Sequence, residues 1–287
     1  MQLNDPIVTV YIPTYNRSAL VKRAIESVLE QTEKNLEVIV VDDNSPDNTQ
    51  EVVSEISRQY PNVRYIRNDE NRGACYNRNV AIKHAKGKFV TGLDDDDYFL
   101  SHRIESFLEA WKTKHPDTIA LFDDVTIKNS EQNSFELVRP DFMGLDELFV
   151  RNDIGNQIFI ERQVFDNGLA YDEDLKSWQD IDLWIHILSV FKGKKFENIH
   201  KKSYIFDKSH PHERISSANI SKHLISFQHI RDKYQLSNAN SYRLKCQAYT
   251  YNPRSVGVTL FLDAFKSRSL YVVFRMIKYY LKNNKGM

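Results

Sequence analysis

Short apolar runs rich in β-branched residues alternate with segments of helical periodicity through the first hundred residues of the chain. The apolar runs lie at residues 7–12, 36–41, 63–67 and 89–93. Segments with apolar residues at roughly helical spacing follow the first three runs, at about residues 19–29, 49–60 and 74–86. Strands that alternate with helices form a mostly parallel sheet with helices on both faces, so this pattern predicts a doubly wound α/β fold.

Polar loops follow the first, second and fourth of these predicted strands. Their sequences are PTYNR, DDNSPD and DDDD. In an open parallel sheet, ligands bind outside the carboxyl ends of the strands, where such loops converge. We therefore expect the three loops to lie together and to form the functional site.

The alternation becomes irregular in the second half of the chain. We expect a helix at about 101–115, a strand at about 119–125, a surface hairpin or loop at KNSEQNS, a strand at 156–161 and a helix at about 178–191. The sheet should therefore become mixed. Beyond about residue 216 the sequence indicates helices only, so we divide the chain into a domain of residues 1–215 and a C-terminal helical region of residues 216–287.

Charge and cysteine content exclude several classes of protein. The 39 basic and 39 acidic residues balance, so no overall field attracts nucleic acid. Cys75 and Cys246 are the only cysteines, which excludes a disulfide framework or a cysteine-rich zinc site and fits a reducing compartment. We see no secretion signal and no run of eighteen apolar residues, so we expect a cytoplasmic protein without a spanning helix.

Four adjacent carboxylates, Asp94, Asp95, Asp96 and Asp97, follow the predicted strand at 89–93. Adjacent carboxylates repel one another unless positive charge lies among them. A Mg²⁺ or Mn²⁺ ion accounts for them, because these hard cations take oxygen ligands and bind together with substrate phosphates. The alternative is a solvated acidic turn before the next helix, where acidic residues are favourable.

Two further acidic motifs also allow two interpretations each. Asp42 and Asp43, after the second predicted strand, either bind a base or ribose or belong to a turn. Asp180 lies in the first turn of a helix whose apolar side chains form a core stripe. Its carboxylate is either held in place for chemistry or is a helix cap.

Four motifs occur in order along residues 7–215: VTVYIPTYNR, EVIVVDDNSPDNT, NDENRGACYNRNVAIKHAKGKFVTGLDDDD and YDEDLKSWQDIDLWIHI. By these motifs the chain resembles glycosyltransferase family 2. The resemblance implies a GT-A fold with a nucleotide-sugar half at about 1–100 and an acceptor half at about 101–215. It implies an inverting hexosyltransferase that uses a nucleoside diphosphate sugar, with UDP the expected nucleotide, and Mn²⁺ or Mg²⁺. One carboxylate base and no visible covalent nucleophile also favour inversion.

The resemblance implies roles for individual residues. The expected substrate-binding residues are Pro13, Thr14, Tyr15, Arg17, Asp43, Arg78, Asp94, Asp95, Trp178, Gln179 and His212. Tyr15 and Asp43 match positions that hold the base, and Pro13 and Thr14 shape the loop beneath it. Arg78 matches a position near the donor pocket.

The Asp-x-Asp motif and the base are also carried over from the resemblance. Asp94 is expected to face the ribose and Asp96 to bind the metal on the diphosphate, whereas Asp95 replaces a small residue. Asp180 is the expected general base, and Gln179 before it replaces the family's glutamate.

The segment SHPHERISS contains His210, His212 and Arg214. A basic polar loop of this kind either closes over the diphosphate or supplies a metal ligand, with His212 the better candidate, or is an ordinary surface loop.

Two other functions remain open alternatives. A nucleotidyltransferase also places metal carboxylates on a doubly wound sheet, but the chain lacks a glycine-rich basic loop near its N-terminus. In a non-catalytic module that binds a sugar or nucleotide, the acidic motifs would remain in the sequence without a catalytic role. By analogy with the family, the expected acceptor is a glycan or lipid-linked oligosaccharide in the synthesis of surface polysaccharide, lipopolysaccharide or O-antigen.

The segment SLYVVFRMIKYYLK, residues 269–282, is too short and too charged to span a bilayer. In a helix, one side carries Leu270, Val273, Phe274, Ile277 and Leu281, and another carries Arg275, Lys278 and Lys282. We expect this helix either to lie on anionic lipid at the inner face of the cytoplasmic membrane, or to pack on the catalytic domain or on a second subunit in a homodimer.

Overall fold

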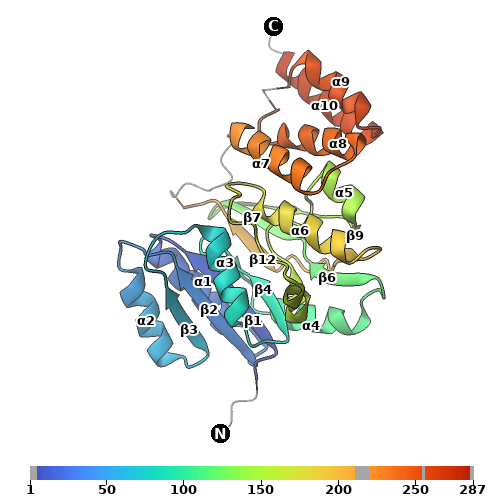
Figure 1. Cartoon of the computed structure of the whole chain (residues 1–287). Coiled ribbons are helices and arrows are strands. Elements are labelled where there is room, and N and C mark those ends of the chain that lie inside the picture. The colour runs from blue at the N-terminus through green and yellow to red at the C-terminus, as the bar shows by residue number, and fades with distance from the viewer. Residues whose placement is uncertain (1–4, 211–219, 254–255, 285–287) are drawn as a thin grey trace.

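The computed structural model describes residues 5–210, 220–253 and 256–284 of the chain (Figure 1). The strands of the first half are β1 Val8–Thr14, β2 Leu36–Asp42, β3 Val63–Arg67 and β4 Phe89–Gly92. The helices between them are α1 Ser18–Leu29, α2 Thr49–Gln59 and α3 Ala74–His84. Every strand and helix predicted in this half is confirmed, with ends shifted by two residues or fewer.

The main sheet has eight strands in the order β3-β2-β1-β4-β10-β6-β11-β9. The additional strands are β6 Thr118–Phe122, β9 Phe142–Met143, β10 Phe159–Glu161 and β11 Lys195–Asn198. Strands β1 to β4 pair in parallel, whereas β10 runs antiparallel to both of its neighbours. The α/β class and the mixed extension of the sheet are therefore confirmed.

Alternation along each buried strand produces the two faces of the sheet. In β1, Val8, Val10 and Ile12 belong to the apolar cluster of α1, α2 and α4 (Arg103–Thr113). The ring of Tyr11 belongs to the opposite cluster, which includes side chains of α3, α5 (Leu145–Val150) and α6 (Gln179–Val190). Helices thus cover both faces, and the loops at the carboxyl ends of the strands remain available for a site.

A second sheet of four strands, ordered β5-β12-β7-β8, lies beside the carboxyl ends of the main sheet. Its strands are β5 Tyr98–Phe99, β7 Val125–Ser130, β8 Asn133–Leu137 and β12 Tyr204–Asp207. The predicted single strand at 119–125 is wrong, because Asp123 and Asp124 divide it. Their carboxylates accept hydrogen bonds from the backbone N–H groups of Lys201, Ser203 and Arg139, so the chain turns from one sheet into the other.

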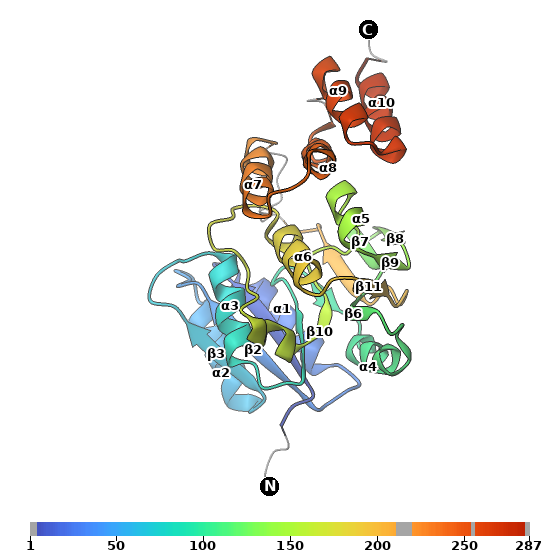
Figure 2. The same cartoon turned by 45° about the vertical axis from the view of Figure 1, so that its right-hand side comes forward.

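The C-terminal region is helical, as the sequence predicts, and its described residues form four helices that lie at the end of the molecule beyond α5 and α6 (Figures 1 and 2). They are α7 Ile220–Lys233, α8 Asn238–Ala248, α9 Val258–Lys266 and α10 Leu270–Asn284. Phe227 of α7 and Leu244 of α8 join the main core, whereas α9 and α10 pack mostly on α8 and on each other. Among the described helices, none has the length and apolar content needed to cross a bilayer.

The predicted apolar stripe of the last helix is only partly correct. Val273 is 8% exposed and packs inward together with Val272 and Met276, whereas Leu270 and Phe274 of the same predicted stripe are 76% and 67% exposed. Arg275, predicted on the cationic side, donates a hydrogen bond to the Val150 carbonyl at 2.8 Å. The helix therefore packs on protein through one face and leaves a second apolar row exposed.

Candidate active site

A cavity of about 870 Å³ opens at the carboxyl ends of β1, β2 and β4. The three polar loops meet there, as their positions after the strands predict. All the described residues to which the family resemblance assigns a role line it: Pro13, Thr14, Tyr15, Arg17, Asp43, Arg78, Asp94, Asp95, Asp96, Trp178, Gln179 and Asp180. His212 lies outside the described residues. A volume of this size is typical of sites for small-molecule ligands.

Asp95 connects the β1 loop to the acidic loop. Its carboxylate accepts hydrogen bonds from Thr14 Oγ1 at 2.8 Å and from Arg17 at 2.9 Å. Burial raises the pKa of Asp95 to about 6, although the charge of Arg17 acts in the opposite direction. Arg17 also pairs with Asp96 at 3.1 Å, so one guanidinium holds two neighbouring carboxylates.

Asp43 shapes the start of α3. Its carboxylate accepts hydrogen bonds from the backbone N–H groups of Arg72 and Gly73 at 2.8 and 2.7 Å, and from the Asn68 amide at 2.9 Å. Gly73 has φ of 87°, a conformation that L side chains rarely adopt. Asp43 therefore fixes the loop at the cavity edge, close to the half-exposed Tyr15 ring.

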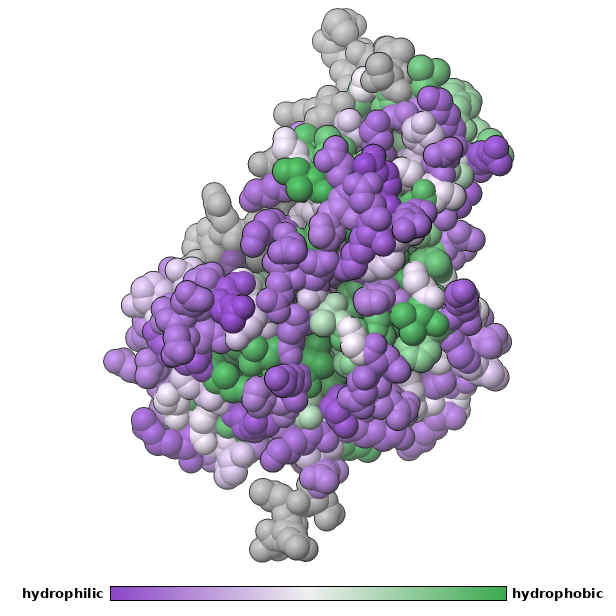
Figure 3. Space-filling view, viewed as in Figure 1, coloured by the Kyte–Doolittle hydropathy of each residue, from purple (hydrophilic) through white to green (hydrophobic). Residues whose placement is uncertain are grey.

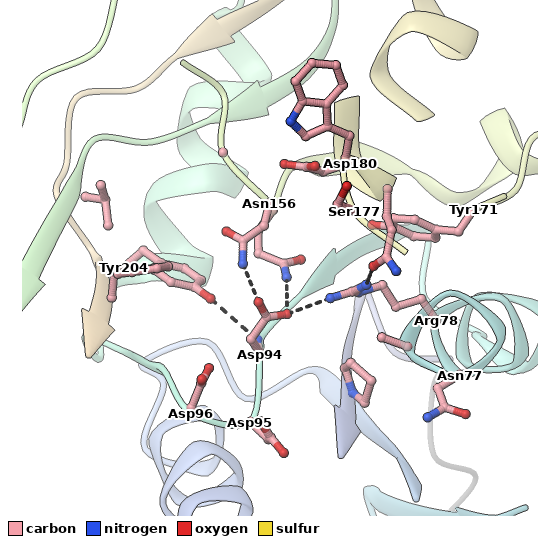
Figure 4. A pocket seen from close by; sticks show the side chains of 18 of the residues that line it. Asn77, Arg78, Asp94, Asp95, Asp96, Asn156, Tyr171, Ser177, Asp180 and Tyr204 are labelled. Carbon is pink, nitrogen blue, oxygen red and sulfur yellow. Dashed lines mark hydrogen bonds and ion pairs between the residues drawn. The ribbon is translucent and has the colours of Figure 1, made fainter. Parts of the chain in front are cut away.

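The Asp94 carboxylate is the centre of the polar network (Figure 4). It accepts hydrogen bonds from Arg78 at 3.1 Å, from Asn156 at 2.5 Å and from Gln157 at 3.0 Å. Arg78 also donates to Gln179 Oε1 at 3.0 Å, which connects the acidic loop to the start of α6. A Cβ on Gly92 would overlap the Gln157 side chain, so only glycine at the end of β4 allows this approach.

Asp94, Asp96 and Asp97 present carboxylate oxygens that all lie within 4.8 Å of one another. Asp97 also accepts hydrogen bonds from Tyr204 Oη at 2.7 Å and from the Asp207 N–H at 3.0 Å. His210 lies 3.5 Å from Asp96. Three oxygen ligands so close together, two of them on buried residues, concentrate negative charge that a hard divalent cation neutralises. The residues present therefore fit Mg²⁺ or Mn²⁺.

Asp180 enters the same cavity from the first turn of α6. Trp178 immediately before this helix has φ of 59°, the left-handed region that a bulky residue rarely adopts. Asn152 donates a hydrogen bond to Asp180 Oδ2 at 2.7 Å. Burial raises the pKa of Asp180, although the Ile181 N–H, the Arg78 charge and the Asn152 bond lower it. Asp182, in contrast, is buried and pairs with Lys233 at 2.8 Å.

Sequence reasoning missed several residues of the site. They are Asn152, Asn156, Gln157, Tyr204, His223 and Tyr251, all of which line the cavity. Asn156 and Gln157 fall inside the predicted strand at 156–161, but the strand begins only at Phe159, so these two residues lie in a loop before it. His223 and Tyr251 come from the C-terminal helical region, and no spacing in the sequence connects them to the acidic motifs.

Comparison with known proteins decides the family. The family model for glycosyl transferase family 2 matches residues 9–165, more than half of the 287 residues. The chain belongs to glycosyltransferase family 2. This member is 32% identical over 247 residues to the putative colanic acid biosynthesis glycosyl transferase WcaA of Escherichia coli K12. The aligned region covers 81% of this chain and 87% of that protein.

A second relative is named for its substrates. The UDP-Glc:alpha-D-GlcNAc-diphosphoundecaprenol beta-1,3-glucosyltransferase WfgD of Escherichia coli is 37% identical over 103 residues, which are 36% of this chain and 40% of that protein. The family 2 chain is thus a glycosyltransferase related to enzymes of polysaccharide biosynthesis.

Solved structures confirm the GT-A fold. Residues 1–349 of Staphylococcus aureus TarS, in complex with UDP-GlcNAc, match with a TM-score of 0.69 at 18% identity, covering 96% of this chain and 88% of that one. The mannosyltransferase PcManGT of Pyrobaculum calidifontis, in complex with GDP-Man and Mn²⁺, matches with a TM-score of 0.59 at 16% identity. The match covers 99% of this chain and 88% of the mannosyltransferase.

Proposed function

We propose that this glycosyltransferase moves a sugar from a nucleoside diphosphate sugar, with UDP as the nucleotide, to a hydroxyl of a glycan acceptor with inversion at the anomeric carbon. One observation carries the proposal: the acidic cluster of Asp94, Asp96 and Asp97 shares a cavity with Asp180, a carboxylate of raised pKa. Arg78 joins the two groups through Asp94 and Gln179.

The donor is assigned to the acidic side of the cavity. The β1 loop, with Tyr15 at its exposed edge, borders the space for the base, and Asp94 and Asp96 are the proposed ribose and metal contacts. Mg²⁺ or Mn²⁺ bound there would neutralise the charge that develops on the leaving diphosphate. TarS and PcManGT, each solved with a nucleotide sugar, support a donor of this class.

Asp180 is the proposed general base. Four other carboxylates of the cavity each pair with an arginine side chain: Asp94, Asp95, Asp96 and Asp123. Asp180 instead accepts hydrogen bonds from the neutral amide of Asn152 and from backbone N–H groups at the start of α6. A raised pKa brings a carboxylate closer to the pH at which it accepts a proton efficiently. Asp180 would accept the acceptor's proton as the oxygen attacks the anomeric carbon, and a single displacement of this kind inverts configuration.

The experiment that tests this function measures nucleotide release from UDP-Glc, UDP-GlcNAc, UDP-Gal and GDP-Man, with Mn²⁺ and with excess chelator. We expect one UDP-sugar to be hydrolysed slowly in the presence of metal only. Release at the same rate in chelator would contradict the metal assignment, and no release or binding with any donor would contradict the function.

The relatives and the last two helices support our proposals for the acceptor and for the location of the enzyme. WfgD is named for a diphosphoundecaprenol-linked acceptor, which supports a lipid-linked or other surface glycan acceptor for this chain. Exposed apolar side chains on the described parts of α9 and α10 include Leu262, Phe265, Leu270, Phe274 and Leu281. Exposed Lys266, Arg268, Lys278 and Lys282 lie among them on the same two helices and the turn that joins them.

We assign this apolar and basic face of α9 and α10 to anionic lipid at the inner face of the cytoplasmic membrane. Figure 3 shows apolar residues at this end of the molecule. Residues 266–287 contain no acidic side chain, so cations attract the face to lipid and apolar side chains enter the headgroup region. The alternative is that a second copy of the chain covers this face and buries the same side chains in a homodimer.

A further inference from the structure

We propose that Trp178, His223 and Tyr251 form a subsite that holds a sugar ring of the acceptor, with the His223 imidazole as its hydrogen-bonding group. This inference rests on the function proposed above and adds to it residues from the C-terminal helices. All three side chains line the cavity that contains Asp180, although His223 and Tyr251 lie far beyond the family's sequence motifs.

The three rings form one aromatic wall. His223 and Tyr251 stack with their ring centroids 4.2 Å apart and their planes at 28°. The Trp178 ring lies 5.7 Å from His223 and 6.2 Å from Tyr251. Aromatic walls with a few polar groups are typical of ligand sites, and the apolar C–H face of a pyranose packs well on such a surface.

His223 carries two of the polar atoms of this wall, and the Trp178 indole N–H is a third that is buried without a hydrogen-bond partner among the described residues. The His223 side chain is buried, with 2% of the residue exposed, and neither ring nitrogen has a hydrogen-bond partner among the described residues. A buried polar atom without a partner is unfavourable, and nearly all such atoms in proteins have one. A sugar hydroxyl, which both donates and accepts, would satisfy either nitrogen of the imidazole.

Position identifies the ligand as acceptor and not donor. Trp178 lies two residues before Asp180, and burial raises the pKa of Tyr251, with the nearby charge of Asp180 raising it further. The nucleotide is assigned to the β1 loop and the acidic loop, and among the described residues the His223 ring nitrogens form no hydrogen bond with either loop. A hydroxyl held against the aromatic wall therefore lies on the side of the cavity from which the base acts.

Helix α7 is fixed in place by contacts that are separate from the wall. Ser226 donates a hydrogen bond to the Ser177 carbonyl at 2.9 Å, directly beside Trp178. At the other end of α7, Lys233 pairs with Asp172 at 2.7 Å and with Asp182 at 2.8 Å. These contacts hold His223 in position before any acceptor arrives, which reduces the ordering cost of binding.

The test compares His223→Phe, His223→Gln and His229→Phe with the wild type. Phenylalanine keeps a ring but cannot form hydrogen bonds, and glutamine retains hydrogen-bonding atoms. His229 is the matched control, because it lies on the same helix, pairs with Asp172 and does not line the cavity. The probes are phenyl glycosides of common hexoses and N-acetylhexosamines, titrated in the presence of UDP and Mn²⁺ and followed by saturation-transfer NMR.

We expect one glycoside to bind the wild type, and His223→Phe to weaken that binding about ten- to a hundredfold while UDP affinity stays within twofold. His223→Gln should retain binding within a few-fold, and His229→Phe should bind like the wild type. Glycoside affinity unchanged in His223→Phe, a parallel loss of UDP affinity, or no glycoside binding by a wild type that binds UDP would each overturn the subsite. A wild type that binds neither UDP nor any UDP-sugar would instead overturn the proposed function, and this inference with it.

Discussion

At the scale of single residues, Asp95 and Asp96 differ in what their carboxylates contact. Arg17 pairs with both, but Asp95 also accepts a hydrogen bond from Thr14, whereas Asp96 belongs to the carboxylate cluster that fits a divalent cation. We expect Asp96→Asn to lose Mn²⁺-dependent UDP affinity by about tenfold or more, and Asp95→Asn to lose much less. Isothermal titration with UDP and Mn²⁺ measures both. Equal losses in the two variants would contradict the assignment of Asp96 to the metal.

A substitution at Asp180 should distinguish donor binding from catalysis. Asp180→Asn keeps the size of the side chain and removes the base, so we expect donor affinity within a small factor and turnover lower by about a hundredfold or more. Steady-state kinetics and thermal melting measure the two effects. Normal turnover in a folded variant would make Asp180 a helix cap only.

The ionisation of Asp180 predicts how activity changes with pH. Burial raises the pKa of Asp180 above its ordinary value of 3.8, and the base acts only when ionised. Activity should therefore fall on acidification at a higher pH than an unperturbed aspartate would give, and the acidic limb should be absent in the residual activity of Asp180→Asn. A rate profile from pH 4 to 8 measures this. An acidic limb that is identical in wild type and variant would assign it to another group.

The sequence predicted the site residues that belong to local motifs and missed those that only the fold brings in. Asp94, Asp96 and Asp180 follow recognisable strand ends or helix starts, so their positions can be read from the chain. Asn156 reaches the cavity from a loop 62 residues after Asp94, and His223 reaches it from a helix 43 residues after Asp180. No periodicity or spacing carries that information, because it depends on how the loop before β10 and helix α7 pack.

At the scale of elements, α7 depends on one partly buried cation. Lys233 pairs with Asp182, whose side chain is fully buried, and with Asp172. We expect Lys233→Met to lower the free energy of unfolding by about 2 kcal/mol, because a buried carboxylate then lacks its partner, and the partial exposure of Lys233 reduces the effect. Urea unfolding measures it, with Lys222→Met, an exposed residue of the same helix, as the control. A loss equal to that of the control would mean that the pair contributes nothing.

Long buried strands and their helices were predictable, whereas short strands were not. Strands β1 to β4 contain four to seven residues in apolar runs, which the period and the β-branched content identify. Strands β5 and β9 have two residues each, too few for any alternation, and exist because β12 and β11 lie beside them. The break at Asp123 also depends on partners eighty residues later, with which the aspartate forms its hydrogen bonds.

At the scale of the whole molecule, the proposed contact of α9 and α10 with anionic lipid can be tested on their exposed apolar side chains. Phe274→Ser with Leu281→Ser removes two exposed apolar side chains without touching the inward-facing Val272, Val273 and Met276. We expect the double variant to bind anionic vesicles several-fold more weakly in flotation assays, and wild-type binding to weaken with salt. Val138→Ser, an equally exposed apolar residue elsewhere, is the control. A wild type that does not float, and that is a dimer by light scattering until the two serines are introduced, would favour a homodimer.

The central claim is that this cavity transfers a sugar with inversion to a hydroxyl activated by Asp180. NMR of the purified product, made from an α-linked UDP-sugar and an acceptor glycoside with Mn²⁺, measures the anomeric configuration directly. The account predicts a β-linked product from the wild type and almost none from Asp180→Asn. An α-linked product, or the same yield of β-linked product from Asp180→Asn, would contradict it.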